Sequence, residues 1–429
     1  MEVISSYKGF KFELYPNEEQ IKMLNNYFGC CRFVYNLFLT IQKDRYEKGE
    51  KYLSKFDMSK ELTKLKQEED KKFLSLAPIG SLQSELANLD SAFQAFFKKR
   101  GGYPKYKSKY KDKPSVIFKG EKHKNKNGSF RFTIEQHADK YWIKLPKLGW
   151  VKMSKGTLPP KDMYILRVTV EKTGSGRYMA SAMGEVDIHQ APKTKKCVGI
   201  DMGLADMMIL SDGTKFENPK FFKEMQKELA KEQKILSRRL RSHIVKEIFY
   251  QSGEKKGQLM RVEYDKPLEE MKNYQKQKIK VAKLHEKIAN QRKHYIHNIT
   301  MQIIRDYDVI CIETLNVKGM AKNKKLSKSI FDVAWGEIIR QLEYKAKWYG
   351  KTLIKIDRWF PSSQTCSCCG HVDGKKELSV REWTCSECGT HHDRDINASI
   401  NILNGGGCVF WKSKVMRKKV KRKRLHNYV

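Results

Sequence analysis

Hydrophobic residues change their spacing along the chain, and these changes divide it into segments of different secondary structure. Residues 8–15 alternate apolar and polar side chains, which predicts a short strand. From Asn17 onward, apolar residues recur at steps of three and four along one helix face: Ile21, Leu24, Phe28, Cys31, Val34, Phe38 and Ile41. Asn17 is a suitable N-cap, because Gln20 follows three residues later as in a capping box. A second helical pattern at 82–97 extends the predicted helical unit over residues 17–100.

Residues 115–190 return to alternation, and glycine-rich turns interrupt it. Four segments of this region are predicted strands: Phe130–Ile134, Tyr141–Leu145, Tyr164–Glu171 and Tyr178–Ala182. We expect these strands to form a small β-barrel or sheet, which the early strand at residues 8–15 joins.

From residue 198 onward, apolar strands and helical patterns alternate, which predicts an α/β domain. A charged stretch at 219–306 is predicted to form two long antiparallel helices, and a further helix is predicted at 331–349. The predicted strands of this part are Val198–Ile200, Tyr307–Ile312 and Thr352–Asp357. The fold class expected for the whole chain is therefore α/β plus β-barrel.

The charge of the chain indicates a polyanion as its partner. Lys and Arg number 86 against 49 Asp and Glu, which leaves a formal net charge of +37. Such a charge attracts nucleic acid through counterion release. An anionic membrane surface could use the same charge, but it would normally come with an amphipathic anchor or a lipidation site. Basic residues run through almost every segment, and residues 412–424 alone contain nine.

One basic segment is interleaved with aromatic residues. Residues 98–113, KKRGGYPKYKSKYKDK, place Tyr103, Tyr106 and Tyr110 among lysines. Lysines can hold phosphates while tyrosines stack on bases, so the segment is a candidate nucleic-acid surface. A solvated basic loop is the alternative interpretation. No stretch of roughly 20 apolar residues and no apolar signal core is present, so a cytosolic protein is expected.

Four cysteines have the spacing of a zinc ribbon. Cys366 and Cys369 form one Cys-x2-Cys pair, Cys385 and Cys388 form a second, and 15 residues separate the pairs. A glycine follows each pair, where a tight turn exposes backbone amides to sulfur. Free or redox-active thiols are the alternative. Because four sulfur ligands complete a tetrahedral site, the predicted zinc is structural.

Other cysteines and histidines are not expected to bind this zinc. Cys368 lies inside the first pair, and His391 and His392 follow the second, but four sulfurs already fill the site. The remaining cysteines lie among apolar neighbours and are predicted to be buried thiols: Cys30, Cys31, Cys197, Cys311 and Cys408.

Three scattered carboxylates are candidate catalytic residues. Asp201 ends the strand CVGID, Glu313 ends the strand DVICIE, and Asp395 begins a predicted helix. Each alone is ordinary, but an RNase H-like fold carries its acids in this order on two strands and a late helix. Two Mg²⁺ ions about 3.5–4 Å apart would need such hard oxygen ligands. Asp393 competes with Asp395, although it is at least as suitable as a helix cap.

At these residues the chain resembles a known family. The segments GIDMGLADMMILSDG, VICIETLNVKGM, WFPSSQTCSCCG and WTCSECGTHHDRDINASINIL resemble the successive signatures of TnpB proteins. These are transposon-encoded nucleases related to type V CRISPR effectors. The N-terminal FELYPNEEQ and FGCCRFVYN also resemble the start of that family, so the resemblance covers nearly the whole chain.

The resemblance implies an RNA-guided DNA endonuclease with a RuvC (RNase H-like) core, a zinc-ribbon insert, a wedge β-barrel and a helical recognition insert. It implies Asp201, Glu313 and Asp395 as catalytic Mg²⁺ ligands, with Mn²⁺ as a substitute, and Cys366, Cys369, Cys385 and Cys388 as ligands of structural Zn²⁺. The implied divisions are the first wedge strand (1–16), recognition domain (17–114), wedge barrel (115–192), RuvC with helical insert (193–357), zinc ribbon (358–391), RuvC C-terminal helix (392–411) and basic tail (412–429).

The implied partners are a guide RNA from the transposon end and a double-stranded DNA target beside a short adjacent motif. The expected location is a prokaryotic cytoplasm, in association with the nucleoid. The oligomeric state is left open, with a monomer favoured because a chain of this length could act alone. Two features depart from the family pattern: an additional piece at 244–269, and Asp206 where a neutral or basic residue is expected. Three alternatives stay open. They are a cleavage-deficient RNA-guided regulator, a DNA transposase, and a basic ribosomal or RNA-packaging protein.

Overall fold

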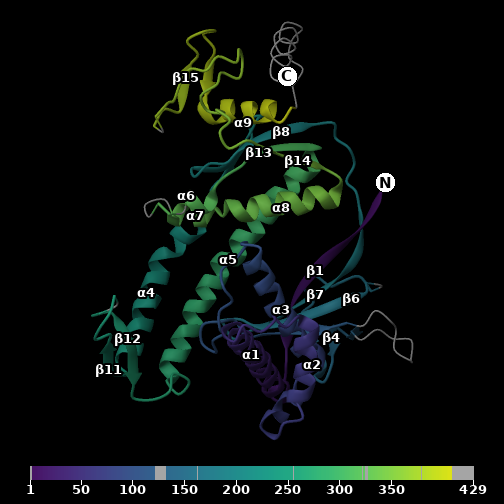
Figure 1. The fold of residues 1–429 in the computed structure, drawn as a ribbon. Coiled ribbons are helices and arrows are strands. Elements are labelled where there is room, and N and C mark those ends of the chain that lie inside the picture. Colours follow the sequence, from purple (N-terminus) through teal and green to yellow (C-terminus); the bar gives the residue numbers. More distant parts are fainter. Residues whose placement is uncertain are drawn as a thin grey trace. The chain divides into compact units, whose positions relative to one another are not determined.

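The computed structural model describes residues 2–120, 132–161, 163–254, 256–320, 322–323, 327–377 and 379–407. The predicted basic tail at 412–429, Cys408 and the start of the predicted strand Phe130–Ile134 lie outside the described residues. The chain divides into two compact units (Figure 1). The N-terminal unit consists of residues 5–187 and 232–283, and the C-terminal unit consists of residues 1–4, 188–231 and those from 284 onward.

Helices and a large sheet form the core of the N-terminal unit. The helices are α1 (Glu18–Glu47), α2 (Lys55–Leu65), the 3₁₀ helix η1 (Glu69–Leu76) and α3 (Ile79–Phe97). The predicted capping box of α1 is confirmed, since Asn17 accepts from the Gln20 amide while the Gln20 side chain accepts from the Asn17 amide. Helices α1 and α3 contact the sheet at its edge strand β2, where Tyr27 packs edge-on against Phe118.

The sheet of this unit has seven strands in the order β2-β6-β7-β1-β5-β4-β3. Their bounds are β1 (Val3–Tyr15), β2 (Ser115–Lys119), β3 (Thr133–His137), β4 (Lys140–Leu145), β5 (Gly149–Met153), β6 (Ile165–Lys172) and β7 (Tyr178–His189). The early strand β1 joins between β7 and β5, as predicted. Strands β2 and β3 are the two edges of this order, so the prediction of a barrel is supported only as far as a seven-stranded sheet.

The charged stretch folds as two helices separated by a hairpin. Helix α4 (Phe221–Arg241) and helix α5 (Lys272–Asp306) are antiparallel, because Phe221 packs on Tyr295 while Glu232 accepts from Gln277. The additional piece at 244–269 contains the antiparallel hairpin β11 (Ile244–Phe249) and β12 (Leu259–Tyr264). The sequence analysis did not predict these two strands, because residues 219–306 have a composition typical of helices throughout.

A mixed five-stranded sheet organises the C-terminal unit, in the order β10-β9-β8-β13-β14. Its strands are β8 (Cys197–Asp201), β9 (Asp206–Leu210), β10 (Lys215–Glu217), β13 (Val309–Glu313) and β14 (Thr352–Ile356). Strand β13 is parallel to both β8 and β14, whereas β9 is antiparallel to β8 and to β10.

Helices cover both faces of this sheet. On one face, the side chains that alternate inward on β8 and β13 pack with α5 and with α8 (Trp335–Tyr349). On the other face, Cys311 packs with Ile402 and Leu403 of α9 (Arg394–Gly405). The predicted helix at 331–349 is interrupted, because Ala334 is left-handed (φ 56°) between α7 (Ser327–Val333) and α8. A four-residue helix α6 (Val317–Met320) precedes α7, and a small ribbon, β15 (Glu382–Thr384) with β16 (His391–Asp393), precedes α9. None of the helices in the described ranges is long and apolar enough to cross a membrane.

A buried ion pair fixes the end of the sheet where its parallel strands begin. Lys351 Nζ, whose side chain is fully buried, lies 2.6 Å from Asp308 Oδ1 and donates to the Pro192 carbonyl. Asp308 Oδ2 accepts from the backbone amides of Thr194 and Lys195. The segments before β8, β13 and β14 are therefore joined by one carboxylate.

Replacing Asp308 by alanine is expected to destabilise the C-terminal unit by about 3 kcal/mol, because Lys351 is left buried and unpaired. Hydrogen bonds from Lys351 and the two amides lower the pKa of Asp308 to about 2 although burial opposes them. The stabilisation is therefore complete above the ordinary carboxyl pKa near 4 and is lost as the pH falls toward 2. Thermal unfolding of the variant measures it, and Asp306→Ala, an exposed neighbour, is the control. Equal melting temperatures for the two variants would contradict this role.

Candidate metal centres

Two of the predicted catalytic acids end adjacent parallel strands. In the register between β8 and β13, Ile200 pairs with Ile312, so the next residues, Asp201 and Glu313, leave the sheet side by side. Carboxyl ends of parallel strands meet at one edge of a sheet, which is where side chains converge on a ligand. The apolar residues before each acid explain this placement, since they bury both strands and leave the acids at the rim.

The third acid reaches this edge through helix α9. Helix α9 packs directly on the backbone of β8, because a Cβ atom at Gly199 would lie 2.0 Å from the Ser399 carbonyl oxygen and 2.6 Å from the Leu403 nitrogen. Asp395 is in the first turn of α9. Asp393 is the N-cap, accepting from the amides of Asp395 and Ile396 and pairing with Lys215 at 2.8 Å. The sequence left open which of these two acids is the catalytic candidate. In the structure, Asp393 caps α9 and Asp395 lies in its first turn.

Electrostatic interaction joins the three acids. Burial, together with the charges of Glu313 and Asp395, raises the pKa of Asp201 to about 7, although the Met202 amide and Arg394 oppose the shift. Like charges disfavour ionisation unless a cation offsets them. In the described part of the chain, the acids do not form a set with ligand oxygens all within 4.8 Å of one another.

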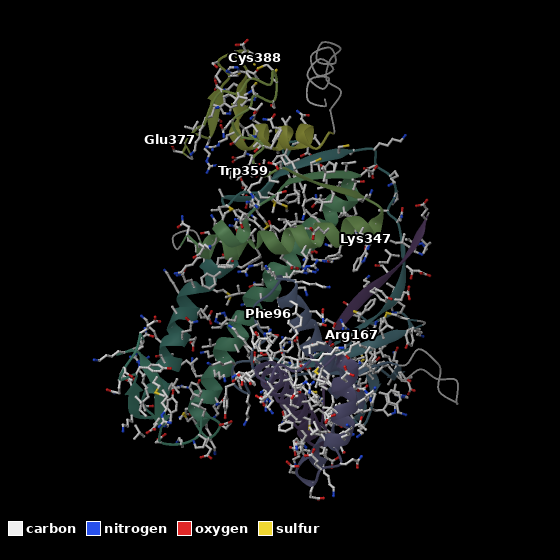
Figure 2. The ribbon with its side chains drawn as sticks, in the orientation of Figure 1. Phe96, Arg167, Lys347, Trp359, Glu377 and Cys388 are labelled. Carbon is white, nitrogen blue, oxygen red and sulfur yellow. The ribbon has the colours of Figure 1, made fainter. Side chains whose placement is uncertain are left out.

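Two further side chains contact these acids, and sequence patterns did not single out either. Ser362 donates its hydroxyl to Glu313 Oε1 at 2.6 Å. Arg381 NH1 lies 3.3 Å from Asp395 Oδ2 and is largely exposed. Both residues follow the sheet in the chain and come from the connection between β14 and α9. Trp359, in the same connection, is 83% exposed (Figure 2).

Alanine at Gly199 is expected to displace α9 from β8, because its methyl group would overlap backbone atoms that cannot rotate away. Overpacking of this kind costs about 1–3 kcal/mol, and the displacement would also move Asp395. Gly336→Ala on α8 is the matched control, since its Cβ meets nothing within 4 Å. Thermal unfolding should show a lower melting temperature for the first variant only. Equal stability of both variants would contradict the close approach of α9.

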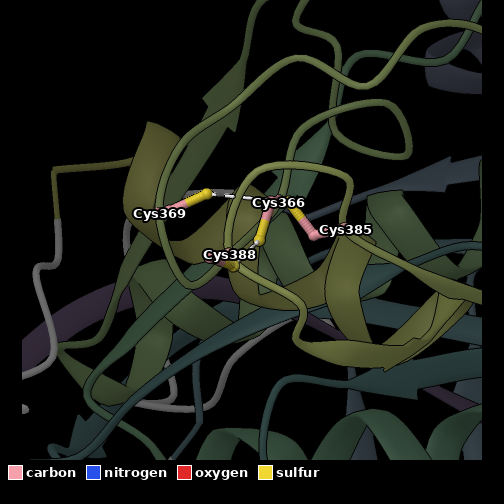
Figure 3. A group of neighbouring side chains, drawn as sticks. All are labelled: Cys366, Cys369, Cys385 and Cys388. Carbon is pink, nitrogen blue, oxygen red and sulfur yellow. Dashed lines mark hydrogen bonds between the residues drawn. The ribbon is translucent and has the colours of Figure 1, made fainter.

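The four predicted zinc ligands are brought together in the C-terminal unit (Figure 3). Cys366 Sγ lies 3.7 Å from Cys388 Sγ, and Cys369 Sγ lies 3.7 Å from Cys385 Sγ. Tetrahedral zinc with Zn–S distances of about 2.3 Å separates its sulfurs by about 3.8 Å. The observed spacing therefore fits a four-cysteine zinc site. Gly370 and Gly389, after the two pairs, have positive φ, as the tight turns require.

Side chains next to the cysteines support this site without belonging to the four-sulfur set. His392 Nε2 lies 3.0 Å from Cys366 Sγ, and its ring packs on Trp383. The Thr390 hydroxyl lies 3.2 Å from Cys388 Sγ. Cys368, inside the first pair, is exposed. A donor to a metal-bound thiolate orients the ligand, so His392 is a candidate supporting residue.

The tyrosine- and lysine-rich segment at 98–113 packs on α1 in the N-terminal unit. Asn36 holds the backbone of Lys107 at both its amide and its carbonyl, and Thr40 contacts the Tyr106 hydroxyl at 3.1 Å. Lys107 also pairs with the buried Glu85. Tyr103, Tyr106 and Tyr110 nevertheless expose about half of their surface. The segment is thus fixed in place while its rings stay accessible.

Three family models match the chain. Residues 6–51 match a model described as a helix-turn-helix domain, residues 166–324 match one described as "Probable transposase", and residues 335–402 match the TNB domain of Cas12f1-like proteins. In this structure, residues 6–51 contain strand β1 and the single helix α1 instead of two helices joined by a turn.

Relatives match over most of the chain. A "Putative RNA-guided DNA endonuclease" of Streptomyces pristinaespiralis is 36% identical over 93% of this chain and 89% of its own length. The "Putative RNA-guided DNA endonuclease InsQ" of Escherichia coli (strain K12) is 30% identical over 94% of this chain and 93% of its own. A "TnpB-like protein L79" of Acanthamoeba polyphaga mimivirus is 26% identical over 31% of this chain and 26% of its own. Among solved structures, one of a Cas12f1–sgRNA–target DNA complex aligns with 93% of this chain and 98% of its own, at 15% identity and a TM-score of 0.49.

Proposed function

Because the chain belongs to the TnpB family of RNA-guided DNA endonucleases, we propose that it hydrolyses DNA phosphodiester bonds at targets matched by a bound guide RNA. The observation that supports this function best is the position of Asp201. It lies at the carboxyl end of β8 beside Glu313, and its pKa responds to both Glu313 and Asp395. We assign the C-terminal unit to the RuvC (RNase H-like) class. The cysteine cluster, formed by Cys366, Cys369, Cys385 and Cys388, would belong to an inserted zinc ribbon.

The three acids fit hard divalent cations, because carboxylate oxygens are the ligands that Mg²⁺ and Mn²⁺ prefer. Asp201, Glu313 and Asp395 would hold Mg²⁺, which supplies Lewis-acid stabilisation and an activated water when bound. The roles of the other side chains follow from their contacts. Ser362 contacts Glu313, and Arg381 lies beside Asp395, where a cationic group can also attract a phosphate.

Binding of nucleic acid is attributed to charge and to exposed aromatic rings. The net charge of +37 favours both RNA and DNA. The fixed segment at 98–113 presents Tyr103, Tyr106 and Tyr110 beside lysines, an arrangement suited to holding a backbone and stacking on bases. We infer that the guide comes from a transposon end and that cleavage requires a short motif beside the target.

One observation favours a second candidate, since residues 166–324 match a family described as "Probable transposase". A transposase of this fold would join the cut strand to a new site instead of releasing it. The cysteine cluster lies between Glu313 and Asp395 in sequence, which argues against a transposase. A cleavage-deficient regulator would typically lack one of the three acids, and all three are present.

Sequencing of RNA that copurifies with the protein tests this proposal. We expect one RNA species with a constant scaffold and a variable guide, and Mg²⁺-dependent cutting of a DNA library that carries the matching target. A library without the match, and reactions with EDTA, are the controls. RNA without a defined scaffold, or no cutting of matched DNA, would contradict RNA-guided cleavage. Covalent joining of the cut end to a second DNA would favour a transposase.

A further inference from the structure

The Ser362 hydroxyl is an unassigned contact at the proposed catalytic centre. Ser362 is 7% exposed, and its oxygen lies 2.6 Å from Glu313 Oε1. An ionised carboxylate can only accept, so the serine donates. A hydroxyl–carboxylate distance of about 2.5–2.7 Å is typical of a charge-assisted hydrogen bond. The terminal torsion of a glutamate side chain is broad, and this bond restricts it.

Two buried amides on α9 hold the serine in place. Asn401 Nδ2 donates to the Ser362 carbonyl at 2.8 Å and to the Thr365 carbonyl at 2.6 Å. Asn397 Nδ2 donates to the same Thr365 carbonyl at 2.8 Å, and Asn397 Oδ1 accepts from the Ser367 amide at 2.8 Å. Asn397 is 1% exposed and Asn401 is 4% exposed. Residues four apart lie on one helix face, so α9 binds the segment from 362 to 367 with a single row of side chains.

This segment connects the two candidate metal centres. Ser362 contacts Glu313 at one end, and at the other end Ser367 lies between the zinc-ligand candidates Cys366 and Cys369. The same helix carries Asp395 in its first turn. If the cysteine cluster moved relative to α9, Ser362, which contacts Glu313, would therefore move with it.

We propose that Ser362 is a positioning residue for Glu313, held by Asn397 and Asn401, which tie the first cysteine pair to the catalytic helix. The proposal rests on the function assigned above. It adds a supporting residue to the Mg²⁺ site and makes the geometry of Glu313 depend on the cysteine cluster. Hydrogen-bond partners of metal-binding carboxylates typically contribute about 10–100-fold to metal affinity or activity.

Titration of the guide-loaded complex with Mg²⁺ tests the role of Ser362. For Ser362→Ala, we expect the Mg²⁺ concentration at half-maximal cleavage to rise about 10-fold or more, with a smaller loss at saturating Mg²⁺. The rise of melting temperature with Mg²⁺ should move to higher concentration in parallel, and zinc content should stay unchanged. Ser363→Ala, at the neighbouring serine that lines a surface hollow with Gln364 and Lys375, should match the wild type.

A double variant separates positioning from a structural role. If Ser362 acts through Glu313, Ser362→Ala should leave the Mg²⁺-dependent melting of a Glu313→Gln variant unchanged. Normal Mg²⁺ dependence in Ser362→Ala, or a lower melting temperature with normal Mg²⁺ dependence, would refute the positioning role. An unchanged Mg²⁺ response in Glu313→Gln itself would instead overturn the metal site of the proposed function.

The amide that holds Ser362 provides a second variant. Asn401→Ala removes the hydrogen bonds that Asn401 donates to the Ser362 and Thr365 carbonyls. We expect the Mg²⁺ concentration at half-maximal cleavage to rise, as for Ser362→Ala. Asn404→Ala, at an exposed asparagine on the same helix, is the control. Identical Mg²⁺ dependence in the Asn401 and Asn404 variants would refute the connection through α9.

Discussion

Replacing Asp201 by alanine or Glu313 by glutamine is expected to abolish DNA cleavage while guide RNA and target DNA still bind. Both acids lie at the carboxyl ends of adjacent strands, and Asp201 responds electrostatically to Glu313 and Asp395. Loss of a metal ligand removes several kcal/mol of transition-state stabilisation, which corresponds to a rate decrease of about 10³-fold or more. Binding depends mainly on basic and aromatic residues elsewhere, so its affinity should change little. Single-turnover cleavage and filter binding measure the two quantities.

Asp393→Asn is the matched control for this prediction. Asparagine caps helices as well as aspartate does, so α9 should keep its start. The exposed pair with Lys215 is lost, and pairs of this kind contribute about 0–1 kcal/mol. Cleavage by Asp393→Asn should therefore stay within a few-fold of the wild type. Unchanged cutting by either the Asp201 or the Glu313 variant would show that the assignment of the two-metal site is wrong.

Replacing Cys385 by serine is expected to release zinc and unfold the ribbon around the cysteine cluster. Structural zinc contributes about 10–16 kcal/mol of apparent binding free energy in small zinc domains, and that energy is folding energy. Cys385 is almost fully buried and lies 3.7 Å from Cys369. Metal analysis should show the loss of one zinc per chain, and thermal unfolding should begin at a lower temperature.

Cys368→Ser is the control for the zinc site, because Cys368 lies inside the first Cys-x2-Cys pair yet is exposed and outside the four-sulfur set. It should keep both zinc and stability. Unchanged zinc content in Cys385→Ser, or equal zinc loss in both variants, would contradict the proposed ligand set. The Ser367 amide, inside the first cysteine pair, donates to Asn397 of α9, the helix that carries Asp395. Loss of zinc should therefore also disturb the proposed catalytic centre and lower cleavage.

Local patterns of the chain predicted many of its elements correctly. The capping box at Asn17 joins residues three positions apart, so its two hydrogen bonds could be predicted from the local sequence alone. The apolar strands that end at Asp201 and Glu313 were predicted for the same reason, since a short buried run followed by an acid is a local signal. The four cysteines were recognised because zinc geometry constrains their spacing directly.

Other features escaped prediction because distant residues impose them. The hairpin of β11 and β12 interrupts a stretch whose composition is helical on both sides. Ala334 divides a predicted single helix with a left-handed residue, which alanine does not favour intrinsically. Ser362 donates to Glu313, which is 49 positions away, and Asn401 donates to Ser362 from 39 positions away. No local pattern indicates these two hydrogen bonds.

The sequence by itself indicated a nucleic-acid partner, the four candidate zinc ligands and the three candidate acids. Charge, cysteine spacing and an acid at the end of a strand or the start of a helix are all properties of residues and short segments. Only the tertiary structure decided which acid caps α9, which serine contacts Glu313 and how closely α9 approaches β8. These depend on the parallel pairing of β8 with β13 and on the absence of a side chain at Gly199. Pairing and packing bring together groups that are remote in sequence, so the geometry of the proposed catalytic centre follows from the fold and not from any single motif.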